Sequence, residues 1–248
     1  MIDLHCHILP ALDDGALDLE DAVAMARGAE DDGIAVVCAT PHIRHDHDVV
    51  IGDLHEMVRE LSAELESRSV ATRVVTGGEV AETAVGGLDD HELRAVSLGG
   101  GGRWILLEPA PGPLGESLDA AVAELSARGY RSVIAHPERH LSEDLEDRLA
   151  RLVGRGALVQ VTAAMLEHEH AAPVIVDFAR RGLVHLLGSD AHSSRGGRPV
   201  RLSRGLEALR DAEPVAPHLD WISRQAPAAI LRGEDVEPPF ALTGARSS

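Results

Sequence analysis

Short apolar segments alternate with amphipathic segments along most of this chain. In residues 53–68, 117–128 and 145–152, apolar residues recur every three or four positions, which predicts helices that bury one face. A further helix is predicted from a cap at Asp18 to Asp32, because Gly33 is a typical helix end. Seven apolar segments are predicted to be strands: 2–5, 34–39, 70–76, 104–108, 132–135, 157–161 and 183–188.

This alternation predicts an α/β fold. Strands separated by helices form parallel sheets, and seven consecutive units favour a closed or nearly closed (β/α)7 barrel of the TIM-like type. A chain of 248 residues is long enough for one such domain. No composition shift marks a boundary, so we predict a single domain over residues 1–233. Residues 234–248 contain a Pro-Pro pair and finish with glycine and serine, which is typical of a loosely ordered tail.

Composition narrows the class of protein. The chain carries 23 basic and 41 acidic residues, a net charge of −18, which disfavours nucleic acids and anionic membranes as partners. No apolar run approaches the roughly 20 residues of a membrane helix, and the first residues do not follow the plan of a signal peptide. Two cysteines, Cys6 and Cys38, do not indicate a disulfide framework. We therefore expect a cytoplasmic globular protein without membrane insertion.

Ionisable side chains gather just after the predicted strands, which is where barrel enzymes place their active sites. The carboxylates are Asp13 or Asp14, Glu79, Glu108 and Asp190. Any one of them has an ordinary alternative, such as capping a helix. The histidines at these strand ends are His5, His7, His42, His136 and His192. Their joint arrival at one rim indicates a metal site.

The number of ligands predicts more than one metal ion. Glu108 follows an apolar run, and a buried carboxylate is costly without a nearby cation. A catalytic zinc uses about three protein ligands, so eight or nine imidazoles and carboxylates imply two or three divalent ions, with Glu79 as a bridge. Such ligands without thiolate suit manganese, zinc or iron; we expect Mn²⁺, with Zn²⁺ or iron as alternatives. Cys6 is expected in the wall of the site.

The chemistry that such a cluster supports is phosphate ester hydrolysis. Closely spaced metals hold a bridging water, lower its pKa so that it attacks as hydroxide, and stabilise the oxygens of an in-line displacement. Arg139 and Arg198 follow the fifth and seventh strands, and guanidinium groups bind phosphate oxygens bidentately. We count these arginines and His42 as catalytic residues. The chain contains no lysine, which excludes a Schiff base, a phosphate-loop lysine and a carbamate bridge between metals.

The motifs follow one another in a characteristic order. They are MIDLHCHILP at 1–10, DDG at 13–15, ATPH at 39–42, GE at 78–79, LE at 107–108, IAHPER at 134–139, QVT at 160–162, GSDAH at 188–192 and GRP at 197–199. This series resembles the polymerase and histidinol phosphatase (PHP) superfamily of metal phosphoesterases. Within it, the chain is most similar to the bacterial protein-tyrosine phosphatases of the CpsB/CapC/YwqE type.

The resemblance implies a distorted seven-stranded barrel, the PHP fold, with three metals. It implies phosphate binding by Arg139 and Arg198, and it favours Asp14 over Asp13 because Asp14 immediately precedes Gly15. It also implies a substrate, phosphotyrosine on a bacterial tyrosine kinase that controls capsule or exopolysaccharide synthesis. One metal would take His5, His7, Glu79 and Asp190; the second Glu79, Glu108 and His136; the third Asp14, His42 and His192.

Three departures from the family pattern lie at the substrate rim. Ile43 stands where a second histidine is common, Pro109 replaces an aromatic residue, and the loop between His192 and Arg198 is a residue longer. These departures leave the metal ligands in place and concern the specificity for phosphotyrosine.

Other functions remain open from the sequence. Cys38 and Arg44 have the C-x5-R spacing of cysteine-dependent tyrosine phosphatases, although the residues between them include Pro41 and lack the glycines that such a phosphate loop needs. Within the PHP superfamily, a small-molecule phosphatase acting on histidinol phosphate or a similar compound is the main alternative. A metal-binding module without catalysis is the third possibility.

Overall fold

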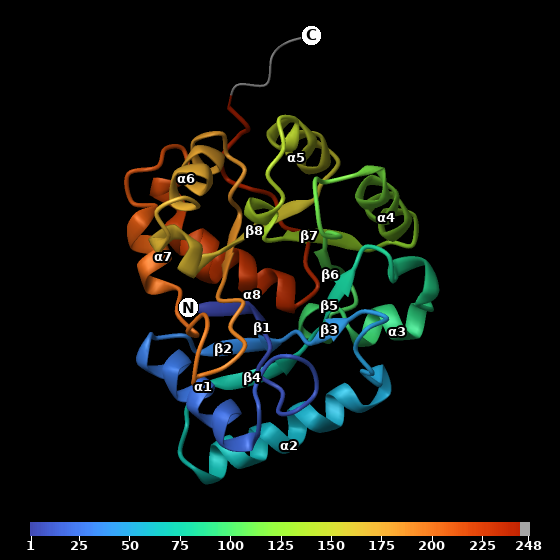
Figure 1. Ribbon diagram of the computed structural model, residues 1–248, viewed down its shortest axis with the longest axis vertical. Coiled ribbons are helices and arrows are strands. Elements are labelled where there is room, and N and C mark those ends of the chain that lie inside the picture. Colours follow the sequence, from blue (N-terminus) through green and yellow to red (C-terminus); the bar gives the residue numbers. More distant parts are fainter. Residues whose placement is uncertain (244–248) are drawn as a thin grey trace.

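The computed structural model describes residues 1–243 as strands alternating with helices (Figure 1). The strands of this part of the chain are β1 (Ile2–Cys6), β2 (Val36–Ala39), β3 (His42–Ile43), β4 (Arg73–Thr76), β5 (Glu79–Ala81), β6 (Trp104–Glu108), β7 (Arg131–Ala135), β8 (Leu158–Thr162) and β9 (Leu186–Gly188). Its α-helices are α1 (Leu19–Asp31), α2 (Leu54–Ser67), α3 (Asp90–Ala95), α4 (Glu116–Ala127), α5 (Leu145–Gly154), α6 (Ala172–Arg180), α7 (Ser203–Ala208) and α8 (Ala226–Leu231).

All pairs of neighbouring strands are parallel, which confirms the predicted α/β class. The strands form two sheets, one in the order β1-β2-β4 and one in the order β3-β5-β6-β7-β8-β9. The end of β1 also meets the segment that follows β9, because Asp190 N donates to His5 O at 2.8 Å and His7 N donates to Ala191 O at 2.9 Å. The carboxyl ends of β1 and β9 therefore lie side by side.

The short strands β3 and β5 are absent from the predicted set. Each is separated from the preceding strand by two residues that interrupt the sheet: Thr40 and Pro41 before β3, Gly77 and Gly78 before β5. A Cβ atom at Gly77 would lie 2.6 Å from Cys38 Sγ, so only glycine allows the two segments to approach so closely. The other predicted strands form within a few residues of the expected limits, as is usual for element boundaries.

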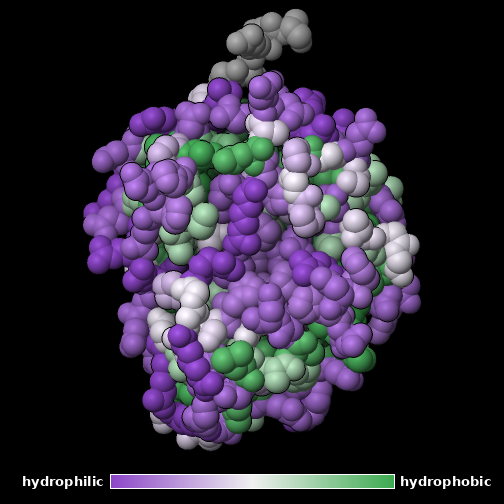
Figure 2. Space-filling model, in the orientation of Figure 1, coloured by the Kyte–Doolittle hydropathy of each residue, from purple (hydrophilic) through white to green (hydrophobic). Residues whose placement is uncertain are grey.

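The helices pack their apolar faces on the sheets. Helix α2 buries Leu54, Val58, Leu61 and Leu65, which recur at helical spacing, and it contacts β4. In Figure 1, α1 and α2 lie below β1, β2 and β4, whereas α4 and α5 lie beside β7 and β8. Asp18 caps α1 as predicted, since its carboxylate accepts a hydrogen bond from Asp21 N at 2.9 Å. The face of the molecule in Figure 2 is largely hydrophilic, with smaller apolar patches. A hydrophilic surface agrees with the net charge of −18.

Every helix in residues 1–243 is too short or too polar to span a lipid bilayer.

Residues 234–243 pack on the rest of the chain, which differs from the loosely ordered tail predicted for 234–248. The indole of Trp104 donates to Glu234 O at 2.8 Å, and Asp235 forms an ion pair with Arg103. Phe240 and Leu242 contact the hydrophobic core, so apolar burial fixes a segment whose composition alone is typical of a tail. Residues 244–248 of the predicted tail lie outside the described residues.

A buried histidine lies under Phe240. His185 is 1% exposed, its Nδ1 accepts a hydrogen bond from Val159 N at 3.0 Å, and its ring stacks on Phe240 at 5.8 Å between centroids. Burial lowers the pKa of His185 to about 3, since the charged imidazolium would be desolvated. The folded protein therefore keeps this imidazole neutral.

We expect His185 to make the stability of the fold depend on pH. Its pKa is lower in the folded chain than in the unfolded chain, so below about pH 6.5 only the unfolded chain takes up this proton, and stability falls towards pH 3. The slope from this group is at most about 1.4 kcal/mol per pH unit. In His185→Gln, whose side-chain oxygen can still accept from Val159 N, urea unfolding at several pH values should show a shallower loss. An identical pH dependence in both proteins would contradict the assignment.

Candidate metal centre and phosphate pocket

The structure brings all nine predicted metal ligands together. They fall into four overlapping groups in which the ligand atoms lie within 4.8 Å of one another. The groups are His5, His7 and Glu79; His5, His136 and Asp190; His42, Glu79 and Glu108; and His7, Asp14, His42 and His192. Shared members join the four groups into one cluster.

The end of β1 positions His5 and His7. Both side chains are fully buried, and the intervening Cys6 belongs to the hydrophobic core, as expected for a residue on the opposite face. His5 Nδ1 donates to Gln160 Oε1 and His7 Nδ1 donates to Asp13 Oδ2, at 2.8 and 2.7 Å. A neutral imidazole that donates through Nδ1 has its Nε2 free to bind a metal, and the Nε2 atoms of both rings face the cluster.

Glu79, at the start of β5, lies at the middle of the cluster. Its carboxylate is 0% exposed and lies 2.8 Å from His136 Nε2, 3.1 Å from His42 Nδ1, and 3.3 Å from the Nε2 atoms of His5 and His7. Burial raises the pKa of Glu79, but the surrounding imidazoles outweigh burial and hold the pKa well below its ordinary value. Glu79 is therefore a buried carboxylate anion.

His136 and Asp190 follow β7 and β9 in a backbone conformation that is uncommon for residues other than glycine. Their φ angles are +32° and +49°, in the left-handed region. Such strain concentrates at functional sites, because only a specific requirement on the side chain offsets it. Here it directs two side chains from neighbouring loops into one cluster with His5.

His42, His192 and Asp14 form the outer part of the cluster. Asp14 Oδ1 lies 3.4 Å from the Nε2 atoms of both histidines, and its side chain is 57% exposed. Burial opposes a charge on His42, but the nearby carboxylates of Glu108 and Glu79 raise its pKa to about 9. Burial and the charge of His7 lower the pKa of His192 to about 4. This edge of the cluster is open to solvent.

The geometry separates the roles of the neighbours Asp13 and Asp14. Asp14 belongs to the cluster, whereas the carboxylate of Asp13 accepts hydrogen bonds from His7 Nδ1, His42 N and Gly15 N. Asp13 is thus an orienting partner of His7. Such partners fix the ring of a metal-binding histidine and increase its basicity.

The grouping of the ligands differs from the grouping that the resemblance implies. His136 groups with His5 and Asp190, and Glu108 groups with His42 and Glu79. Glu79 lies between these groups, with Oε1 facing His5 and His136 and Oε2 facing His7 and His42.

Arg139 and Arg198 lie beside the cluster, and both contact Asp190. Arg139 forms an ion pair with the Asp190 carboxylate, and Arg198 Nη2 lies 3.1 Å from Asp190 Oδ1. Together with seven of the nine ligands, they line a pocket of about 360 Å³. About a third of each arginine side chain is exposed, so the guanidinium groups can reach a ligand in the pocket.

Two contributors to the site were not singled out from the sequence. Arg44 lines the same pocket, and its Nη1 lies 3.1 Å from Glu108 Oε1. Gln160 orients His5 from β8. Gln160 follows a predicted strand, but a side-chain amide is a weak indication of a metal site. In the sequence, Arg44 stands out only by its spacing from Cys38.

The cysteine-based alternative does not fit this structure. Cys38 is 0% exposed within β2, and burial raises the pKa of its thiol to about 12. A thiol with this pKa is not ionised near neutral pH, so it is not a nucleophile.

The residues present fit divalent metal ions. Four buried polar atoms of the cluster have no hydrogen-bond partner within residues 1–243: His42 Nδ1, Glu79 Oε2, His136 Nδ1 and Asp190 Oδ1. Buried polar atoms are rarely left unpaired, and all four of these belong to residues of the ligand groups. Imidazole nitrogens and carboxylate oxygens are the ligands that manganese, zinc and iron share.

Known proteins are similar to this chain in sequence and in fold. Tyrosine-protein phosphatase YwqE of Bacillus subtilis (strain 168) is 32% identical over 96% of this chain and 95% of its own length. A putative tyrosine-protein phosphatase CapC of Staphylococcus aureus is 28% identical over 82% of this chain and 81% of its own.

The structural comparison agrees. A crystal structure from work on YwqE of Bacillus subtilis and CpsB of Streptococcus pneumoniae, described there as unique metal-dependent tyrosine phosphatases, superposes with a TM-score of 0.82. The two chains are 28% identical, and the match covers 98% of this chain and 100% of the other. Residues 1–231 match the family described as capsular polysaccharide synthesis, CpsB/CapC, and the chain belongs to this family.

Proposed function

We propose that the chain is a metal-dependent phosphomonoesterase that hydrolyses phosphotyrosine in proteins. The observation that carries the proposal is the meeting of nine metal-ligand side chains with two arginines around one pocket. The similarity to proteins named tyrosine-protein phosphatases supports phosphotyrosine as the substrate class. The family description supports a substrate in capsule synthesis, and we propose a bacterial tyrosine kinase that controls it.

Two or three divalent metal ions, with Mn²⁺ as our first choice, would be held by His5, His7, Asp14, His42, Glu79, Glu108, His136, Asp190 and His192. Divalent ions bound close together lower the pKa of water and stabilise negative charge on phosphoryl oxygens. Glu79 is suited to bridge two of them, because each of its oxygens faces a different pair of histidines.

The arginines would bind the phosphate group. Arg139 and Arg198 converge on Asp190 from two loops, and a phosphate in the pocket offers the same kind of anionic oxygen that this carboxylate now offers. Local positive charge of this kind is required because the net charge of −18 repels an anionic substrate. His42 would contact the substrate, because it lines the pocket and lies next to Asp14 at the exposed edge of the cluster.

We also propose that the strands form a distorted (β/α)7 barrel, with β2 and β3 acting as one interrupted strand and β4 and β5 as another. The contact between the end of β1 and the segment after β9 supports closure of the ring. The single domain is proposed to span residues 1–233, with residues 234–243 packed against it, and the protein is proposed to act in the cytoplasm.

The first prediction concerns the reaction. After removal of metals the protein should hydrolyse neither p-nitrophenyl phosphate nor a phosphotyrosine peptide, and Mn²⁺ should restore both activities. Activity on histidinol phosphate should be lower, by kcat/KM, than activity on the peptide.

The variant His136→Ala should lose turnover while its circular dichroism spectrum stays that of the folded protein. A preference for histidinol phosphate would assign the site to a small-molecule phosphatase, and tight metal binding without turnover would identify a non-catalytic module.

The second prediction concerns Arg139. Replacement by alanine should lower kcat/KM for p-nitrophenyl phosphate by about tenfold to a hundredfold, the loss expected for hydrogen bonds to a charged group. Metal content, measured in parallel, should remain that of the unmodified protein. Arg201→Ala is the matched control, because Arg201 pairs with Glu167 on the surface and does not line the pocket. Normal hydrolysis by Arg139→Ala would show that this arginine does not bind the phosphate.

The third prediction separates the two phosphatase chemistries. Cys38→Ser should retain nearly full activity on p-nitrophenyl phosphate, because the buried thiol of Cys38 is protonated and faces β4 through a contact with Thr76 O. Chelation should abolish the activity of the same sample. Loss of activity in Cys38→Ser together with full activity after chelation would establish a cysteine nucleophile.

A further inference from the structure

A hollow on the surface continues from the candidate phosphate pocket. Arg44 lines both the pocket and a wider hollow of about 680 Å³ between the loop after β3 and the segment that leads into α3. Val50, with 61% exposure, is one of the most exposed large apolar side chains in residues 1–243, and it lines this hollow together with Val49, Ile51 and Leu88. An exposed aliphatic wall next to a highly charged site is unusual for surface that faces only water.

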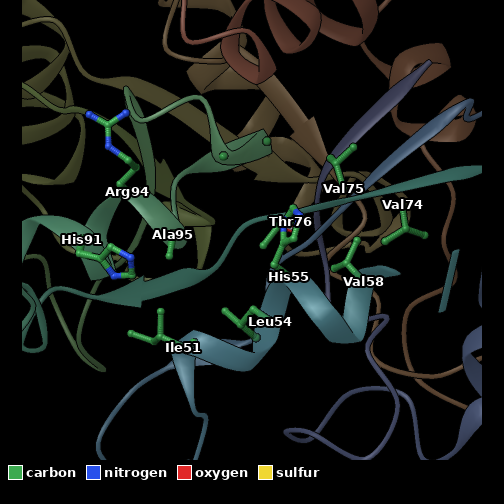
Figure 3. A pocket seen from close by; sticks show the side chains of 13 residues that line it. Ile51, Leu54, His55, Val58, Val74, Val75, Thr76, His91, Arg94 and Ala95 are labelled. Atoms are coloured by element: carbon green, nitrogen blue, oxygen red, sulfur yellow. Dashed lines mark hydrogen bonds between the residues drawn. The ribbon is translucent and has the colours of Figure 1, made fainter. Parts of the chain in front are cut away.

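The hollow leads on into a second pocket. Ile51, Gly52 and His91 line both, and the second pocket, of about 650 Å³, lies between α2, α3 and β4. Figure 3 shows Ile51 and Leu54 on one side of this pocket and the α3 residues His91, Arg94 and Ala95 on the other. Shared lining residues thus place the three hollows in a row from the phosphate pocket to α3, and we call the two hollows beyond the pocket the α2–α3 groove.

The charge at the far end of the α2–α3 groove favours an acidic residue. Asp89 and Glu92 line the hollow next to Arg44, and each of their carboxylates accepts a hydrogen bond from the other's backbone in the capping box of α3. The residues that line the second pocket include Arg94, His55 and His91 and no carboxylate. Arg94 is thus the one always-charged side chain that lines this pocket, and it can pair with an acidic residue of a ligand.

We propose that the α2–α3 groove binds the polypeptide on one side of the phosphotyrosine, and that it selects substrates with aliphatic and acidic residues there. This inference rests on the proposed function and names the kind of sequence that the enzyme reads. The continuity through Arg44 supports a chain that extends out of the phosphate pocket, since a small phosphate ester would end within it. Aliphatic residues of the substrate would contact Val50 and Ile51, and acidic residues would pair with Arg94 and His91.

The test compares two phosphotyrosine peptides of about ten residues with p-nitrophenyl phosphate, all with the Mn²⁺-loaded full chain. One peptide carries valine and glutamate on both sides of the phosphotyrosine, and the other carries serine and glycine. We expect the first peptide to have the higher kcat/KM by about tenfold, the size of effect of one well-buried apolar contact. Val50→Asp should reduce the ratio of kcat/KM for this peptide to that for p-nitrophenyl phosphate by about tenfold, through KM.

Two further variants make the result specific. Leu141→Asp is the matched control, because Leu141 is 62% exposed but does not line the groove, and it should leave the ratio near that of the unmodified protein. Arg94→Glu should reduce the preference for glutamate over glutamine in the flanking positions.

Each contrary outcome is distinct. Equal kcat/KM for the two peptides, or equal effects of Val50→Asp and Leu141→Asp, would overturn the proposed groove while leaving the phosphatase intact. A change in the molecular mass of the protein in solution on Val50→Asp would identify the groove as an interface between copies of this chain, which would also overturn it. Absence of p-nitrophenyl phosphate hydrolysis with every metal tested would instead overturn the proposed function.

Discussion

The burial of one carboxylate among four imidazoles is the interaction on which the rest of the site depends. Glu79 has no exposed surface, and its oxygens lie within 3.3 Å of nitrogen atoms of His5, His7, His42 and His136. A lone buried charge of this kind would be strongly destabilising. The strand ends must therefore converge, because only convergence surrounds the carboxylate with groups that can share a proton or a metal ion with it.

The sheet explains how this convergence is achieved. Parallel strands end at the same edge, so residues far apart in the sequence meet there without long connections. Gly77 and Gly78 allow β4 and β5 to pass close to their neighbours, and this approach sets the position of Glu79. A set of partners behind the ligands, Asp13 and Gln160 among them, then fixes which nitrogen of each imidazole faces inward.

The surroundings of the cluster divide into two kinds of surface. Arginines next to Asp190 provide charge for a phosphate group, whereas the α2–α3 groove provides aliphatic and basic surface beyond Arg44. The arginines alone would bind any phosphate ester of suitable size. Selection among phosphorylated proteins requires a surface such as the α2–α3 groove, which would contact substrate residues away from the phosphate group.

The sequence by itself determined the α/β class, the main strands and all nine residues that gather in the cluster, because strand-end position and residue chemistry are both local properties. The choice of Asp14 over Asp13 came from the resemblance to the family, in which the aspartate precedes the glycine. The observed grouping of the ligands did not follow from the sequence, since it depends on distances between side chains from separate strand ends. Only the tertiary structure showed Arg44 beside Glu108, Phe240 stacked on His185 and the groove between α2 and α3. These features join segments between about 55 and 65 residues apart or lie between helices, and no periodicity or motif in a single segment encodes such contacts.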